Sequence, residues 1–469
     1  MRLHSLLSRY ILLPLGKTYS RRNYFKALKY QHFLEETQYW ERSAIEAWRT
    51  EHFLKLIAHC YENVPYYRMY MDKYDLHPRD FQSLEDVKKL PVMTKEILNE
   101  NFELLKATNY KQRDIRYDTT GGTTGVPATI GIDQRNEYRV DAMWRRCWGY
   151  AGYVPGMKIM LFWCNQSELI KNKSLHERVK GIMNNSITLD FMDLYDSRLE
   201  QYAKYINKVQ PEVIRGYSNA VYLFVQYCNK NKIKFVKSPK GIIITSDKIH
   251  SNQKREISEF FECEIFEEYG CHEFSVIAHE CEAHKGLHLA EEHFIFEVFN
   301  PISQNFSFQG EGDIIISSLF NYALPLLRYN LGDRVFLSKE SCACGRNLKL
   351  ISDLYGRTVD FALTKSDRVF YGSFFTALFL NISGITKYQV HQYKKGEIII
   401  YLIKNDKFDE KEIENVSVQL KNIFKDDMSF EYKYVDEIDI PLSGKRTSFI
   451  SNISYSYLKD IYVKCQYTV

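Results

Sequence analysis

The chain has 469 residues, which is too long for one hydrophobic core and predicts two or three domains. Its 63 basic and 59 acidic side chains leave a formal net charge of +4, so no strong overall field favours nucleic acid as a partner. The ten cysteines form no regular disulfide framework and no signal-peptide cleavage site is recognisable, which together indicate a reducing, cytoplasmic location.

The first residues are apolar, but Arg9 and Pro14 interrupt them, so this stretch is too short to span a bilayer. The following run from Lys17 to Lys29 adds further basic side chains. Two interpretations stay open for this segment: peripheral contact with a membrane surface, or a packed helix with a solvated basic face. The packed helix is the favoured one.

Residues 35–75 carry apolar side chains at helical spacing, and Asn63-Val64-Pro65 ends the pattern. Thr94 has the residue type of a helix N-cap and predicts a short helix after it. We expect both segments to pack on the main core.

The stretch Tyr117–Pro127 packs glycines and hydroxyls together. Its three glycines let the backbone reach positive φ and its threonines add donors, which suits the oxygens of a polyphosphate. It is not a Walker A motif, because Pro127 blocks a helix and residues 128–132 predict another strand. The stretch is therefore a phosphate-binding loop between two strands or a glycine-rich hairpin.

A helix is expected at about 134–149, with Trp144 and Trp148 on one face, where core packing is the default interpretation. Beyond it, short apolar runs alternate with helical stretches, which predicts an α/β domain with a largely buried sheet. The expected strands cover 158–164, 187–192, 211–216, 241–245 and 263–269, and the expected helices 219–230 and 252–261.

Two of these strands end in polar residues, at the edge of the sheet where ligands usually bind. The first ends in Ser246 and Asp247. The second runs into Tyr269–Glu273, where we expect Gly270 to end the strand. An aromatic ring, an imidazole and a carboxylate there fit a base-stacking wall with a magnesium ligand, or a surface turn.

The carboxy-terminal part has a different pattern. Residues 311–319 and 326–337 predict antiparallel strands, and the composition changes after Tyr355. After that break, a hairpin over 385–404, a helix over 410–424 and a strand over 429–435 predict a small α+β domain.

Four residues suggest a structural zinc site: Cys281, His288, Cys342 and Cys344. Three thiols and one imidazole are a usual tetrahedral set, and four protein ligands leave no open position for catalysis. His279 and His284 compete with His288 as the nitrogen ligand, and unrelated buried thiols are the alternative. A non-catalytic zinc-knuckle binding protein is the competing class, although no basic stripe around the knuckle favours nucleic acid.

Five motifs follow one another in order: Thr-Thr-Gly-Gly-Thr-Thr-Gly-x-Pro, Tyr-Gly-x-x-Glu, Arg-Tyr-x-x-Gly-Asp, Gly-Arg-x-x-Asp and Pro-Leu-Ser-Gly-Lys. Together they resemble the adenylate-forming superfamily of acyl-CoA synthetases. From about Trp40 to the end, the chain looks most like the phenylacetate-CoA ligase family, in the CapK-like branch labelled as capsular polysaccharide biosynthesis proteins.

This resemblance implies an α/β fold whose large N-terminal domain, residues 1–355, has several subdomains, mostly buried sheets and a β-barrel-like part. A hinge at about 356–360 would lead to a small mobile α+β domain over 361–469. The implied reaction is ATP-dependent activation of a carboxylic acid as an acyl-adenylate, followed by transfer to coenzyme A with Mg²⁺ as cofactor. An amine or hydroxyl of a glycan precursor or carrier is the alternative acceptor, in capsular or surface polysaccharide modification.

The resemblance also assigns residue roles. The phosphates of ATP would be held by Thr119, Thr120, Gly121, Gly122, Thr123, Thr124 and Gly125. Adenine would stack on Tyr269 beside Gly270, Ser246 and Asp247, while Asp333 would bind the ribose and Arg357 would lie by the nucleotide before the hinge residue Asp360. Catalysis would rest on Lys445, Thr120, Glu273 as the magnesium ligand, and His272 near the α-phosphate or the acyl group.

Two departures from the family pattern are visible. His272 replaces the usual threonine or serine, and Ala128 replaces a lysine that often follows the loop proline. The acyl pocket is expected between the helix carrying Trp144 and Trp148 and the strand end at Tyr217, where aromatic side chains would favour an apolar or aromatic acid.

Overall fold

The computed structural model describes residues 21–119, 128–163, 185–191, 196–246, 249, 251–301, 303–357, 361–366, 368–371, 375, 378–379, 382, 384–438, 449–451 and 453. Several residues with predicted roles lie outside this range: Thr120, Gly121, Gly122, Thr123, Thr124, Gly125, Asp247, Asp360 and Lys445. The side chains of Thr119 and Arg357 are likewise outside the description.

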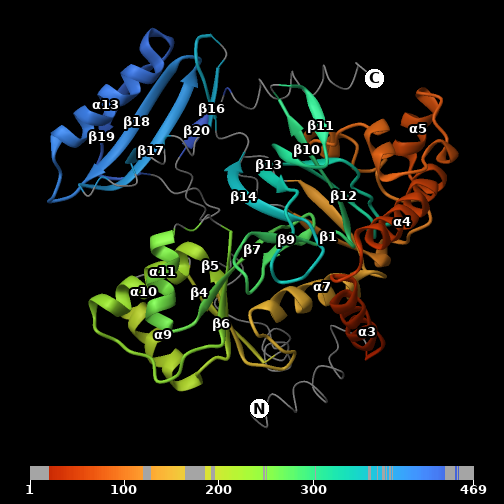
Figure 1. Ribbon diagram of the computed structural model, residues 1–469, viewed down its shortest axis with the longest axis horizontal. Coiled ribbons are helices and arrows are strands. Elements are labelled where there is room, and N and C mark those ends of the chain that lie inside the picture. The colour runs from red at the N-terminus through yellow and green to blue at the C-terminus, as the bar shows by residue number, and fades with distance from the viewer. Residues whose placement is uncertain are drawn as a thin grey trace.

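The helices expected at about 134–149, 219–230, 252–261 and 410–424 are present, whereas the helix over 196–209 was not predicted (Figure 1). The described helices are α3 (Arg21–Thr37), α4 (Arg42–Asn63), α5 (Pro65–Lys73), α6 (Lys95–Glu100), α7 (Glu137–Tyr150), α9 (Asp196–Val209), α10 (Ser218–Lys230), α11 (Ser251–Phe261) and α13 (Glu410–Phe424). Short 3-10 turns are η2 (Pro78–Asp80), η3 (Leu84–Lys89), η4 (Gln112–Asp114) and η6 (Lys425–Asp427).

Local residue chemistry sets several helix ends. Helix α4 ends at Asn63 and α5 begins at Pro65, whose missing N–H is tolerated in the first turn of a helix. The Thr94 side chain accepts a hydrogen bond from the Ile97 N–H and caps α6. In this part of the chain, the sequence predictions for helices are confirmed.

Twelve strands form one sheet in the order β11-β10-β12-β13-β14-β9-β8-β7-β6-β5-β3-β4. Their bounds are β3 (Ile159–Trp163), β4 (Ser186–Asp190), β5 (Val213–Tyr217), β6 (Gly241–Thr245), β7 (Glu264–Cys271), β8 (Ser275–Glu280), β9 (Leu287–Leu289), β10 (Phe294–Asn300), β11 (Asn305–Ser307), β12 (Gly310–Ser318), β13 (Tyr329–Ser338) and β14 (Leu350–Arg357).

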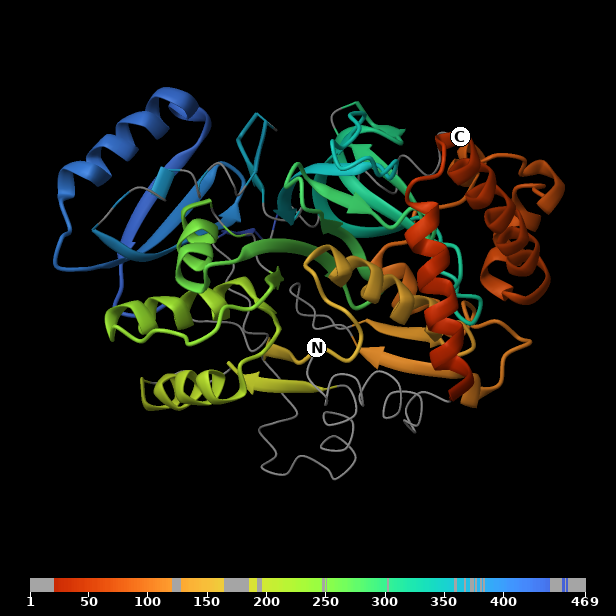
Figure 2. The ribbon, with the colours of Figure 1, turned by 60° about the horizontal axis from the view of Figure 1, so that its bottom comes forward.

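The half of the sheet from β7 to β4 is parallel. Helices α9, α10 and α11 cover one face of it, where apolar residues such as Phe162, Ile214 and Phe224 form a core. Figure 2 shows these helices in yellow-green beside the strands. Helix α7 covers the other face, where Trp148 packs against Ile159, Val213 and Ile243. The predicted α/β layering is therefore confirmed.

The other half, from β11 to β7, is antiparallel and corresponds to the part that we expect to be barrel-like. Its apolar side chains join those of α4 and α5 in the largest core of the described chain. Earlier in the chain, β1 (Ile115–Thr119) and β2 (Thr129–Asp133) pair antiparallel, with Thr119 opposite Thr129. Thus the glycine-rich stretch connects two paired strands, as predicted.

Two strand predictions need correction. Gly270 does not end its strand, because β7 continues to Cys271 through a register shift between Tyr269 and Gly270. A Cβ at Gly270 would lie 2.3 Å from the Ser275 carbonyl oxygen, so glycine serves close strand approach here. Strand β13 starts at Tyr329, later than expected, because Arg328 has a left-handed φ of 51°.

The carboxy-terminal part contains a four-stranded sheet in the order β19-β18-β17-β20, with β17 (Ile385–Lys394), β18 (Glu397–Lys404), β19 (Ser429–Tyr434) and β20 (Phe449–Ser451). Helix α13 packs on one face of it through residues such as Leu420 and Phe424. A short pair, β15 (Phe361–Leu363) and β16 (Val369–Tyr371), precedes it. None of the described helices is both long and apolar enough to cross a membrane.

Candidate functional site

Two motif residues that are far apart in the sequence contact each other on the large sheet. The hydroxyl of Tyr269, on β7, donates a hydrogen bond of 2.7 Å to Oδ2 of Asp333, on β13. This bond holds the hydroxyl end of the Tyr269 side chain, and the residue is only 7% exposed to solvent. A buried aromatic ring beside an accessible carboxylate suits a base next to a sugar hydroxyl.

A second tyrosine–carboxylate pair lies next to the first. The hydroxyl of Tyr329 donates a hydrogen bond of 3.1 Å to Oε1 of Glu273, in the turn between β7 and β8. Tyr329 is 2% exposed. The sequence does not predict this role for Tyr329, because the contact depends on how β13 pairs in the sheet.

Arg328 fixes the backbone in front of Tyr329. Its guanidinium pairs with Glu297 at 3.0 Å and also donates to the carbonyl oxygens of Lys88 and Leu90. Glu297 is 1% exposed, and this pairing satisfies both buried charges. The arginine of the Arg-Tyr-x-x-Gly-Asp motif is therefore an internal anchor that holds the chain where Tyr329 begins β13.

The remaining predicted nucleotide residues lie at the ends of other strands of the same sheet or in the β7–β8 turn. Ser246 follows β6 with a φ of 81°, and Arg357 ends β14 directly opposite Asp333 in the strand register. His272 is exposed in the β7–β8 turn beside Glu273. The structure thus brings the Tyr-Gly-x-x-Glu, Arg-Tyr-x-x-Gly-Asp and Gly-Arg motifs to one edge of the sheet.

The predicted acyl-pocket residues gather around a buried charge that the sequence analysis missed. Arg215, on β5, lies under the rings of Trp144, Trp148 and Trp163, at 4.8, 5.3 and 4.5 Å from their centroids. Tyr217 packs on Trp163 with a centroid distance of 4.4 Å. Trp144, Trp148 and Tyr217 therefore lie in one cluster, as predicted, but the cluster is centred on Arg215, which the sequence analysis did not single out.

Glu268 neutralises this arginine. Its carboxylate accepts a bond of 2.5 Å from Nη2 of Arg215 and one of 2.8 Å from the indole N–H of Trp148. Burial alone would raise the pKa of Glu268, but the Arg215 charge outweighs it and holds that pKa below its ordinary value. An arginine inside the apolar run Val213-Ile214-Arg215 was the available sequence signal for this pair.

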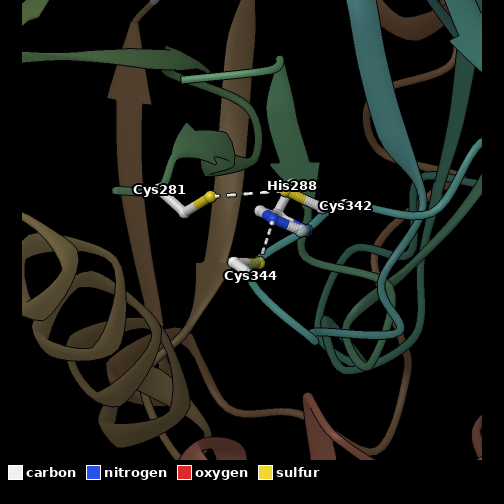
Figure 3. Close-up of side chains that lie close together, drawn as sticks. All are labelled: Cys281, His288, Cys342 and Cys344. Atoms are coloured by element: carbon white, nitrogen blue, oxygen red, sulfur yellow. Dashed lines mark hydrogen bonds between the residues drawn. The ribbon is translucent and has the colours of Figure 1, made fainter. Parts of the chain in front are cut away.

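The predicted zinc ligands also converge (Figure 3). The ligand atoms of Cys281, His288, Cys342 and Cys344 all lie within 4.8 Å of one another. The Cys281 and Cys342 sulfurs are 3.7 Å apart, and the Cys344 sulfur is 3.3 Å from Nε2 of His288. Tetrahedral zinc with these ligand types places neighbouring ligand atoms about 3.5–3.8 Å apart, so the four residues fit a zinc ion.

The structure also selects among the candidate histidines. Nδ1 of His288 lies 3.3 Å from the Leu348 carbonyl oxygen, which leaves Nε2 turned toward the sulfurs. Burial lowers the pKa of His288 to about 4, so its imidazole is neutral at physiological pH, as a ligand must be. His284 instead faces Glu280 at 3.0 Å, and His279 lies against the Glu280 carbonyl oxygen.

Comparison with known proteins gives the same picture as the motifs. A family model described as the CapK C-terminal domain matches residues 363–452. A phenylacetate-coenzyme A ligase of Thermus thermophilus is 24% identical over 76% of this chain and 80% of its own length. Protein CapK of Staphylococcus aureus is 23% identical over 93% of this chain and 95% of its own length.

Among solved structures, a 2-hydroxyisobutyryl-CoA ligase in the postadenylation state matches with a TM-score of 0.69 at 14% identity. The match covers 90% of this chain and 93% of that one. The resemblance to phenylacetate-CoA ligases and to CapK is thereby confirmed, and the fold is that of the adenylate-forming ligases.

Proposed function

We propose that this chain, an ATP-dependent ligase of the adenylate-forming group, activates a carboxylic acid as an acyl-adenylate and then transfers the acyl group to coenzyme A. The observation that carries this proposal is the pair of hydrogen bonds Tyr269–Asp333 and Tyr329–Glu273. Each bond joins two motif residues that are far apart in the sequence, by 64 positions in the first pair and 56 in the second, at one edge of the sheet. Such ends of an α/β sheet are where nucleotides bind.

The described residues support a role for each member of this group. Tyr269 would present its ring to adenine, Asp333 would accept hydrogen bonds from the ribose, and Glu273 would hold Mg²⁺ in a position fixed by Tyr329. The carboxylate must attack the α-phosphate of ATP, and Mg²⁺ when bound reduces the repulsion between these two anions. No protein nucleophile is needed, which agrees with a site built from binding groups.

Other parts of the proposal rest on the motifs alone. Thr119 to Gly125, which lie between β1 and β2 in the sequence, would wrap the β- and γ-phosphates. Lys445 would supply a cation to the reacting groups, and His272 would stand near the α-phosphate or the acyl group. The region after residue 356 would act as a hinge for the carboxy-terminal domain.

We further propose a structural zinc ion held by Cys281, His288, Cys342 and Cys344. It would join the end of β8 and β9 to the loop before β14, two segments that are about sixty residues apart. Such an ion would close a long chain loop and contribute to folding stability. Four protein ligands leave no position for substrate, so the reaction does not pass through this site.

The match to CapK along nearly the whole chain favours a second candidate for the acceptor. In that case the acyl group would pass to an amine or hydroxyl of a surface-polysaccharide precursor. The two candidates share the adenylation step and differ only in what completes the reaction.

An ATP–pyrophosphate exchange assay tests the adenylation step. Exchange that depends on an added carboxylic acid and is lost in Glu273→Gln is the expected result, and release of AMP should then be followed with and without coenzyme A. If none of the carboxylic acids in a broad panel supports exchange, the proposed enzyme class is wrong. Acid-dependent exchange without a thioester product in the presence of coenzyme A would instead favour the polysaccharide acceptor.

A further inference from the structure

We infer that Arg215 selects the acid substrate, and that this acid carries a neutral oxygen acceptor, such as a hydroxyl or a carbonyl oxygen, away from its carboxylate. The inference rests on the proposed function and makes its substrate class specific. It starts from Arg215 and Glu268, which are 5% and 6% exposed under the aromatic side chains of α7. Three of the five tryptophans of the chain surround this one guanidinium.

The pair occupies the edge of the sheet where the acid is expected. Arg215 is the third residue of β5, two residues before Tyr217 at the carboxyl end of that strand. Glu268 directly precedes Tyr269 of the nucleotide group on β7, although the two side chains point to opposite faces of the strand. The Trp144 indole donates a hydrogen bond to Ser275, which follows the turn that carries Glu273. A substrate lying between the aromatic rings and the α-phosphate would therefore meet this cluster.

Arg215 differs from the structural arginines of the chain. Arg49, Arg146 and Arg328 each pair with a buried glutamate and also donate to a main-chain carbonyl oxygen, which ties distant segments together. Arg215 has no such tie. Its Nε and Nη2 face Glu268, and no partner of Nη1 occurs among the described residues. The Nε atoms of Arg49 and Arg146 also lack a partner, but they are fully enclosed, whereas Nη1 of Arg215 is not.

A buried ion pair by itself adds little to stability, because desolvation of both charges offsets their attraction. Because Nη1 of Arg215 lacks a protein partner and is not enclosed, it is available for a bond with the substrate at this edge of the sheet. The guanidinium plane sandwiched by indole rings is also held in one orientation, which suits selection.

The net charge of the cluster decides the class of acceptor. Arg215 and Glu268 together are neutral, and they lie under aromatic rings of low polarity. A second carboxylate on the acid would leave one uncompensated negative charge in this setting, and an ammonium group would face a guanidinium. A hydrocarbon acid would leave Nη1 unpaired. A neutral oxygen acceptor satisfies Nη1 without adding charge.

The test uses the full-length protein and acids matched in skeleton. Phenylacetate, 4-hydroxyphenylacetate, 4-carboxyphenylacetate and 4-(aminomethyl)phenylacetate form one set, and butanoate, 4-hydroxybutanoate, succinate and 4-aminobutanoate the other. We expect pyrophosphate exchange to favour the hydroxy acid of at least one set by about 100-fold or more in kcat/KM, since sites built to bond a substrate hydroxyl reject analogues lacking it. Quenching of tryptophan fluorescence should show the same order in binding without ATP.

Arg215→Met combined with Glu268→Gln removes the pair without leaving a lone buried charge. This variant should reduce the preference to a few-fold while the plain acid is still activated, and ATP binding should stay unchanged. The matched control is Arg145→Met with Asp141→Asn, an ion pair of 2.7 Å within α7 that is separate from the Arg215–Glu268 pair. Its acid preference should equal that of the wild type. If the double variant at Arg215 does not fold, Arg215→Lys tests the same loss of planar donors.

A wild-type preference for the hydrocarbon, dicarboxylic or amino acid overturns the inference but leaves acid activation intact. So does a hydroxy-acid preference that survives in both Arg215 variants. Absence of exchange with every acid of both sets, together with no fluorescence change, removes the proposed function itself and the inference with it.

Discussion

The Tyr329→Phe substitution would remove one hydroxyl from the candidate nucleotide site and leave the ring in place. Tyr329 is 2% exposed and its hydroxyl lies 3.1 Å from Oε1 of Glu273. A hydrogen bond to a charged group contributes about 1.5–3 kcal/mol, and the rather long distance points to the lower end of that range. Without it Glu273 is less well positioned, so Mg²⁺–ATP should bind about 10-fold more weakly.

Calorimetric titration with a non-hydrolysable ATP analogue, at several Mg²⁺ concentrations, measures this loss directly. Tyr110→Phe is the matched control, because the Tyr110 hydroxyl donates to Oδ2 of Asp133 at 2.8 Å in another part of the molecule. Both variants should lower the melting temperature by similar amounts, but only Tyr329→Phe should raise the Mg²⁺ requirement. Equal nucleotide affinity in the two variants would refute the positioning role of Tyr329.

Three further outcomes are expected. Lys445→Ala should slow acid-dependent pyrophosphate exchange by about 10²–10³-fold, because a cation near the reacting phosphate is lost. The variant should largely retain thioester formation from a supplied acyl-adenylate, and equal losses in both half-reactions would count against a role of Lys445 in adenylation. Cys342→Ser should release zinc, measured by metal analysis, and should lower the melting temperature before activity is lost. Cys228 is a buried cysteine outside the proposed zinc set, so protein carrying Cys228→Ser should retain zinc. Burial holds the pKa of His293 well below its ordinary value of 6.5, so below about pH 6.5 the unfolded state binds a proton that the folded state does not, and stability falls. In urea unfolding, His293→Gln should flatten this dependence of the unfolding free energy on pH by up to about 1.4 kcal/mol per pH unit. An unchanged slope would contradict this assignment.

Local chemistry explains which parts of the fold could be predicted. Helix α13 has the predicted bounds, because Asp409 caps its start and apolar residues recur along one face. The hairpin of β17 and β18 turns at Gly396, which has a φ of 74°. In both cases the determining residues lie within a few positions of the element that they define.

The predictions that failed or were never made depend on pairing between distant strands. Gly270 looks like a strand terminator in the sequence, yet it continues β7 because the Ser275 carbonyl comes too close for a side chain. The pair Arg215–Glu268 arises only because β5 and β7 lie on either side of β6. A sequence pattern shows a charge in an apolar strand, but it does not show which opposite charge the sheet places beside it.

The β7–β8 hairpin connects the three groups of residues that we assign to function. Along β7, Glu268 reaches the aromatic cluster and Tyr269 reaches Asp333, because successive side chains of a strand point to opposite faces. The turn carries Glu273, β8 begins at the Trp144 partner Ser275, and Cys281 of the proposed zinc set follows its last residue. A slip of one residue in this pairing would exchange the faces and separate all three groups. A zinc ion held by the proposed cysteine and histidine ligands would fix the far end of β8 against the loop before β14 and would preserve this register. Its removal should therefore weaken acid selection and nucleotide binding together, although neither site contacts the metal.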